Sequence, residues 1–168
     1  MRAVLPCLVL CGCASLDVVR QVLPSPLRRS SQVLIEDLPV VDHSDARWPL
    51  LQNEKGLQTI AHDLATHLPE LRILEQSDRS GPADLILRGE LLASRYKRTL
   101  AVEARFQLED ISGMITDDFI VRGSSYSMSG YLHQIVEQVS AYLRRRAGLP
   151  PCTAAGMIVN SAGVSWCN

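Results

Sequence analysis

Apolar and polar residues alternate through two stretches in the middle of the chain, residues 84–94 and 99–109. A period of two residues is typical of a β-strand with one face buried and the other in water. The second stretch runs into Asp110-Ile-Ser-Gly113, which predicts a turn followed by a third strand over 114–122. The centre of the chain is therefore predicted to be an antiparallel meander with one wet face. The apolar residues that are predicted to form the buried face of the first two strands are Leu85, Leu87, Leu91, Ala93, Leu100, Val102, Ala104, Phe106 and Leu108.

Charged residues on the wet face predict how the first two strands are aligned. A register centred in the turn at residues 95–98 would place Glu90 opposite Glu103, and like charges directly opposite each other are unfavourable. We expect instead a shift of two residues, which pairs Glu90 with Arg105. The same argument allows a pair between Arg88 and Glu103. Because the turn contains neither Gly nor Asn, we predict a loop longer than two residues.

Two helices and two further strands are predicted around the meander. Apolar residues at helical spacing predict helices over 53–68 and about 131–146. Aliphatic runs predict strands over 32–41 and 71–75. This order predicts an α+β fold, a two-layer sandwich with a mixed, mostly antiparallel sheet of about four to five strands and both helices on one face. The exposed edges of such a sheet are available for pairing with other chains.

Composition excludes some classes of partner. The chain has 168 residues, with 17 basic against 18 acidic side chains, so no global positive charge attracts nucleic acid. Only two Phe and two Trp are present, which leaves few aromatic platforms for stacking bases.

The first residues are typical of an export signal. Met1-Arg2 is followed by an apolar run to Leu10 that is too short to span a bilayer as a mature helix. Leu10-Cys11-Gly12-Cys13 resembles the lipobox of bacterial lipoproteins, which implies that Cys13 becomes a lipidated first residue and sends the protein to the outer membrane. The alternative is an ordinary secretory leader cut after Ala14.

Cysteine positions suggest a disulfide near the end of the chain. In an oxidising compartment Cys152 and Cys167 form the pair that remains beside the lipidated residue, and a bridge between them would staple a small hairpin predicted over 156–166. The alternative is two free thiols. The resulting organisation is a signal peptide (1–12), a lipidated tether (13–31), the α+β domain (32–148) and a disulfide-closed tail (149–168).

No residue pattern predicts catalysis, a metal site or a cofactor. His43, Ser44 and Asp45 are neighbours in sequence and do not converge as a catalytic triad. On the first helix, His62 and His67 are five residues apart and do not share a face well. The serine- and glycine-rich segment 123–130 lacks the phosphate-loop pattern and is interpreted as the start of the last helix.

The arginine run 144–146 has two interpretations. Cations at a helix C-terminus are favourable by about 0.3 to 1 kcal/mol, which is sufficient reason for the run. The alternative is contact with anionic lipid head groups or an acidic partner.

A family resemblance refines the expected role. Ala83-Asp84-Leu-Ile-Leu-Arg-Gly89, the strand pair ending Leu108-Glu-Asp110-Ile-Ser-Gly113 and a closing helix resemble bacterial envelope domains related to the TolB amino-terminal domain. The chain is most similar to the middle domain of flagellar assembly protein T, over about residues 31–153 and including the Leu149-Pro-Pro-Cys152 junction.

The resemblance implies a structural role in the periplasmic ring around the flagellar basal body. The same fold group also resembles lipoprotein activators of peptidoglycan synthases and curli-secretion lipoproteins. We therefore expect a non-enzymatic envelope protein that contacts flagellar or other envelope proteins, and further copies of itself, through its sheet face and edges.

Overall fold

The structure is a computed structural model of the chain. It describes residues 14–36, 40–42, 55–75, 82–96, 99–125, 128–150, 157–159 and 165–167. The two helices are α1 (Lys55–His67) and α2 (Met128–Arg146). The strands are β1 (Ser15–Gln21), β2 (Gln32–Ile35), β3 (Val40–Asp42), β4 (Arg72–Glu75), β5 (Leu85–Tyr96), β6 (Thr99–Asp110), β7 (Ile115–Ser125), β8 (Met157–Val159) and β9 (Ser165–Cys167).

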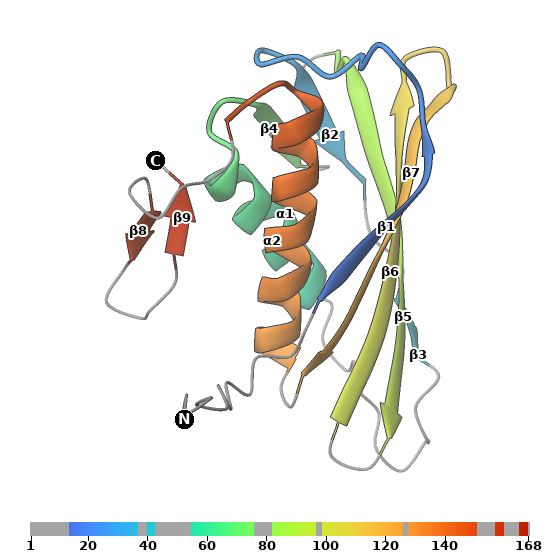
Figure 1. Ribbon diagram of the computed structural model, residues 1–168, viewed down its shortest axis with the longest axis vertical. Helices are drawn as coiled ribbons and strands as arrows, with labels where there is room; N and C mark the ends of the chain where they lie inside the picture. Colours follow the sequence, from blue (N-terminus) through green and yellow to red (C-terminus); the bar gives the residue numbers. More distant parts are fainter. Residues whose placement is uncertain are drawn as a thin grey trace, which may run out of the picture.

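Within the described residues, the main sheet has seven strands, six of them in the order β1-β7-β6-β5-β2-β4 with β3 also pairing with β5. Strands β1, β7, β6 and β5 are antiparallel neighbours, whereas β2, β3 and β4 join by parallel pairing. Both helices cover one face of this sheet (Figure 1). The α+β class and the mixed sheet are as predicted, but the sheet is larger than the four to five strands expected.

One of the additional strands is β1, within the segment predicted to be a tether. Ser15–Gln21 pairs antiparallel with β7, and Leu16 packs against the core. Farther along the same segment, Leu27 is buried. Pro24 and Pro26, residues typical of a linker, follow the strand instead of interrupting it. Much of the predicted tether is therefore part of the folded domain.

The other additional strand comes from dividing the predicted strand 32–41. Its first part forms β2, between β4 and β5, and its last residues form β3, which pairs farther along β5. Pro39 lies between the two pieces, where a residue without a backbone N–H cannot continue a ladder. Strand β4 and the start of α1 fall close to their predicted positions, and α2 begins three residues earlier than predicted.

The alignment of β5 and β6 confirms the register predicted from charge. Glu90 lies opposite Arg105. The predicted longer loop is wrong, because pairing continues to Tyr96 opposite Thr99 and leaves only residues 97–98 between the strands. Each strand has 12 residues, and the two are paired along their whole length, so the turn residues have little influence on the register.

The core lies between the inner face of the sheet and the two helices. Ring contacts run from Phe106 through Phe119 to Tyr142, with centroid separations of 5.5 and 4.2 Å. Both helices, and Leu68 directly after α1, contribute fully buried aliphatic residues to this layer: Ile60, Leu64, Leu68, Ile135, Val139 and Leu143.

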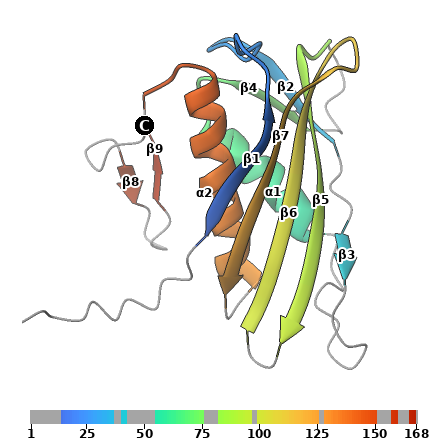
Figure 2. The same ribbon diagram turned by 45° about the vertical axis from the view of Figure 1, so that its right-hand side comes forward.

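The predicted terminal hairpin is present as the antiparallel pair β8 and β9. It lies on the helix side of the molecule, away from the main sheet (Figures 1 and 2). Cys167 ends β9, opposite Met157. Its side chain and the whole of Cys152 lie outside the described residues, and so does the predicted bridge.

Candidate interaction surface

The face of the sheet that the helices leave uncovered carries a dense set of charged side chains and one polar amide, Gln107. These residues occupy every second position of β5, β6 and β7, on the side of the sheet away from the helices. Strand β1 and the residue after β2 contribute further members. We call this set the charged face: Asp17, Arg20, Glu36, Arg88, Glu90, Glu103, Arg105, Gln107, Glu109, Asp118 and Arg122.

Two arginines of the charged face each bridge two carboxylates that come from different segments of the chain. Arg88 Nε lies 2.8 Å from Glu36 Oε2, and its Nη1 lies 3.1 Å from Glu109 Oε2. Arg122 pairs through Nε with Glu103 at 2.7 Å and through Nη1 with Asp17. Both arginine side chains remain close to half exposed. Pairs of this kind contribute little to stability.

At the centre of the charged face, Arg105 binds Asp118 with two parallel hydrogen bonds. Its Nε and Nη2 lie 3.0 and 2.5 Å from the two carboxylate oxygens, and the Gln107 amide donates a third hydrogen bond at 3.3 Å. The Arg105 hydrogen bond is the main reason that the pKa of Asp118 lies below its ordinary value. A two-pronged contact fixes the guanidinium plane better than a single one. The charged face is therefore a pre-organised surface.

A second polar cluster lies buried where the end of α2 meets β7 and β1. Asp117 is fully buried, and the Tyr142 hydroxyl donates to its Oδ1 at 2.6 Å. Thr116 Oγ1 donates to Oδ2 at 3.0 Å. Arg146 Nε forms an ion pair with Oδ1 at 2.5 Å, and its Nη2 donates to Oδ2 at 3.1 Å and to the Val22 carbonyl at 2.8 Å. Burial, together with the Asp117 carboxylate, raises the pKa of Tyr142.

Most of the arginine run at the end of α2 is directed into the protein. Arg144 donates to both oxygens of Glu70, at 2.8 and 3.0 Å, and to the Pro150 carbonyl at 3.1 Å. Arg144 and Arg146 are each 5% exposed, whereas Arg145 is exposed and lies over the Tyr142 ring. Contact with lipid or with an acidic partner is thus left to Arg145 alone. The signal missed in the sequence was Asp117, a carboxylate at a core position of its strand that requires a buried cation.

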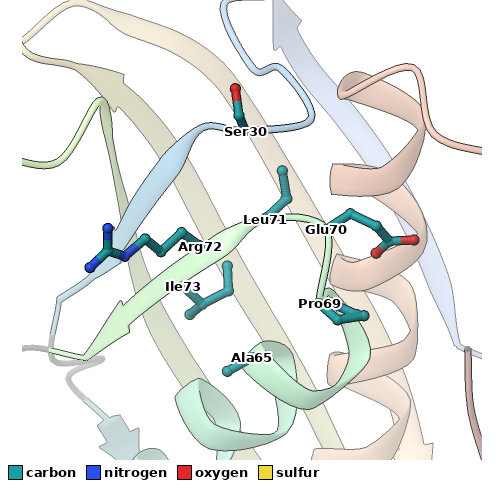
Figure 3. A pocket seen from close by; sticks show the side chains of 7 residues that line it. All are labelled: Ser30, Ala65, Pro69, Glu70, Leu71, Arg72 and Ile73. Carbon is teal, nitrogen blue, oxygen red and sulfur yellow. The ribbon is translucent and has the colours of Figure 1, made fainter.

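A shallow groove of about 390 Å³ lies beside the edge strand β4 (Figure 3). In this view Glu70 points toward α2 and Arg72 points away from it. Glu70 is already bound by Arg144, an interaction that outweighs the effect of burial and lowers its pKa. The one carboxylate among the lining residues is thus already paired. Its lining residues are Ser30, Ala65, Pro69, Glu70, Leu71, Arg72 and Ile73.

Histidines of the two helices face each other in the structure. The rings of His67 and His133 are 6.5 Å apart, edge to face, and His133 Nε2 lies 3.4 Å from Glu137. Burial lowers the pKa of His67, and the charge of His133 adds to the effect. His62 is exposed on α1, and the structure does not bring it together with His67 as ligands. Across the described ranges, no group of three or more His, Cys, Asp or Glu is arranged to hold a metal ion.

Several predicted site residues lie outside the described residues. These are Cys13 and Cys152, and the segment from His43 to Asp45, which was not expected to form a triad, lies outside them as well. Of the helices that the structure describes, none is long and apolar enough to cross a membrane.

Comparison with known proteins gives a similarity in fold. No family model and no curated protein matches the chain. A PelC dodecamer from Paraburkholderia phytofirmans is 15% identical, with a TM-score of 0.53, and the match covers 82% of this chain and 100% of that one. A variant of the same dodecamer is 16% identical, with a TM-score of 0.48 and coverage of 82% and 98%. An uncharacterized protein is 16% identical, with a TM-score of 0.47 and coverage of 72% and 94%.

Proposed function

We propose that the protein is a lipid-anchored scaffold of the outer membrane, exposed to the periplasm, which works by docking other proteins and further copies of itself. The observation that carries the proposal is the position of the lipobox-like Leu10-Cys11-Gly12-Cys13 immediately before a folded strand. Only Ala14 separates Cys13 from β1. Two residue steps span at most about 7 Å, so an anchor at Cys13 would hold this edge of the sheet against the membrane.

A short connection of this kind restricts how the domain moves. A flexible tether would let the domain sample many orientations, whereas an anchor next to β1 fixes one edge of the sheet near the lipid surface. The charged face would then meet partners in a limited range of orientations. Acyl chains contribute about 0.8 kcal/mol per buried methylene, which is sufficient for stable anchoring when three chains are present.

The charged face supports docking as the activity. Its arginines are fixed by carboxylates before any partner arrives, so less side-chain entropy is lost on binding. Ordered charges of both signs favour partner selection and correct alignment. The occurrence of the same fold in the PelC dodecamer is compatible with self-association, which the proposal includes.

Lipid attachment is tested by metabolic labelling with an alkyne analogue of palmitate, followed by separation of the membranes. We expect the wild-type protein to be labelled and found in the outer membrane. Cys13→Ser should lose the label, whereas Cys11→Ser, a matched change two residues away, should retain it. Unlabelled wild-type protein would remove the anchor from the proposal.

The class of partner is tested by cross-linking in cells from the charged face. A photo-reactive amino acid replaces Glu90, and the matched control replaces Ile111 in the turn between β6 and β7. We expect flagellar ring proteins to be captured from position 90 and not from 111. Specific capture of a peptidoglycan synthase would favour the regulatory lipoprotein, and equal capture from both positions would contradict docking through this face.

A further inference from the structure

The edge of the sheet formed by β1 is exposed and apolar at its centre. Within the described part of the chain, β1 pairs only with β7, on one side. Val18 and Val19 are 42% and 57% exposed, and both are among the large apolar side chains that the fold leaves in water. Open edges with exposed aliphatic residues are templates for pairing with another strand.

A β-bulge at Val19 changes which side chains of β1 share a face. Asp17 pairs with Ile120 and Arg20 pairs with Asp118, while the register shifts between Val18 and Arg20. Residues 118 and 120 are two apart on β7 and lie on one face, so their partners Asp17 and Arg20 lie on that face too. In a regular strand, residues three apart would point to opposite faces. The bulge thus places both charges of β1 on the charged face.

With both charges on one face, the charge order of β1 is complementary to that of a second, antiparallel copy of β1. We propose that two copies of the chain pair through β1 across a two-fold axis, with Asp17 opposite Arg20 of the partner subunit and the valines in contact between them. This deepens the self-association included in the proposed function. Both charge pairs form at once because the contact is symmetric. A parallel alignment would place Asp17 against Asp17 of the partner subunit, which is unfavourable.

The opposite edge of the sheet shows why the bulge matters. Strand β4 has a similar order of charge, from Arg72 to Glu75 around two aliphatic residues. Its pairing with β2 is regular, so positions 72 and 75, which are three residues apart, belong to opposite faces of the sheet. In a two-fold antiparallel contact, the same face of both sheets lies on the same side of the joined sheet. Residues from opposite faces, such as positions 72 and 75, therefore cannot meet across the contact. A similar order of charges therefore allows two copies to pair through β1, where the bulge places both charges on one face, and not through β4.

The rest of the structure leaves β1 available and limits the length of the contact. Asp17 is 59% exposed although it pairs with Arg122, and the exposed Arg20 acts on Asp118 through its charge. At the end of the strand, Arg146 donates to the Val22 carbonyl and occupies that backbone group. Pairing is therefore confined to residues 15–21 and would join the two sheets into one.

The test uses full-length protein in detergent and charge reversal with mixing. In the Arg20→Asp variant, a carboxylate at position 20 faces Asp17 of the partner subunit at both ends of the contact. In the Asp17→Arg variant, a guanidinium at position 17 faces the partner's Arg20 at both ends. We expect each variant to weaken dimerisation at least about tenfold by sedimentation velocity. An equimolar mixture restores dimers, because every position 17 then faces an opposite charge at position 20.

Controls separate this contact from general effects of charge or folding. Arg72→Asp makes the same change on the other edge strand and should dimerise as the wild type does. Circular dichroism shows whether each variant is folded, and the rescue by mixing requires that both variants are. A monomeric wild-type protein, an Arg20→Asp variant that associates normally, or a mixture of folded variants that stays monomeric would each overturn the proposal. The labelling of Cys13 is independent of these results, so failure of the edge contact is distinguished from failure of the anchor.

Discussion

The Tyr142 hydroxyl donates a hydrogen bond of 2.6 Å to Oδ1 of Asp117, and both side chains are buried, at 1% and 0% exposure. This contact joins the last helix to the strand β7 that carries the charged face on its other side. Arg146 reaches the same carboxylate from one helical turn farther along and also binds the Val22 carbonyl. One buried carboxylate thus links β7 and the end of β1 to α2.

Removal of the Tyr142 hydroxyl should destabilise the fold without emptying the core. Tyr142→Phe keeps the ring against Phe119 and deletes one hydrogen bond to a buried charge, so we expect a loss of about 1–3 kcal/mol in the free energy of unfolding. Urea denaturation measures it. Ala141→Ser, at an exposed position on the same helix, should stay within about 0.5 kcal/mol of the wild type. Equal stability of Tyr142→Phe and the wild type would show that the hydroxyl is not needed.

Removal of one partner of the Asp117–Arg146 ion pair should destabilise the fold strongly, whereas replacement of both partners by apolar residues should destabilise it much less. Asp117→Leu or Arg146→Met leaves one buried charge without its partner, and we expect each to cost about 3–5 kcal/mol. The double variant removes both charges and should recover most of that loss. Unfolding of the three variants under the same conditions gives the coupling energy. Additive losses in the double variant would mean that the two side chains act independently.

The turn between β6 and β7 should tolerate side-chain changes at one position and not at another. Gly113 has a φ of 81°, and a Cβ there would meet no atom within 4 Å. The cost of Gly113→Ala is therefore backbone strain alone, about 1–2 kcal/mol. Ile111→Ala in the same turn, at an 81% exposed position, should change stability by less than about 0.5 kcal/mol. Thermal unfolding compares the two, and an unaffected Gly113→Ala would contradict the turn conformation.

Mild acid should weaken the contact between the helices through His67. Its pKa is lowered by burial and by His133, so the unfolded chain binds this proton more readily than the folded one. Stability therefore falls as the pH drops through the ordinary value of 6.5. Asp63 and Glu137 oppose this shift without reversing it.

The measurement is the free energy of unfolding between about pH 7.5 and 5.5, a range above the region where paired carboxylates titrate. His67→Gln should flatten the dependence. His62→Gln, which changes an exposed histidine on the same helix, should keep the wild-type slope. An unchanged slope in His67→Gln would assign the pH dependence to other groups.

The sequence was sufficient to predict the parts of the fold that burial determines. Alternation predicted the meander, and the opposed charges of Glu90 and Arg105 predicted its register. Strand β1 was missed because Pro24 and Pro26 follow it so closely that the whole segment resembled a linker. Its identity as a strand depends on the distant partner β7, which local composition does not reveal.

The roles of the arginines could be predicted only in part. A cation at a helix end has a sufficient local explanation, so no pattern in the sequence predicted that Arg146 would be buried. Asp117 offered the one available signal, since it shares the parity of Phe119 and Val121, both buried. A carboxylate on that face requires a partner, but only the packing of α2 shows which of three neighbouring arginines supplies it.

The central claim, that the domain is held at the membrane through Cys13, is tested most directly by the intact mass and N-terminal peptide of protein extracted from membranes. The account predicts a chain that begins at Cys13 and carries the added mass of a diacylglycerol group and an N-linked acyl chain. A chain that begins at Ser15 without lipid, or one that retains Met1, would contradict it.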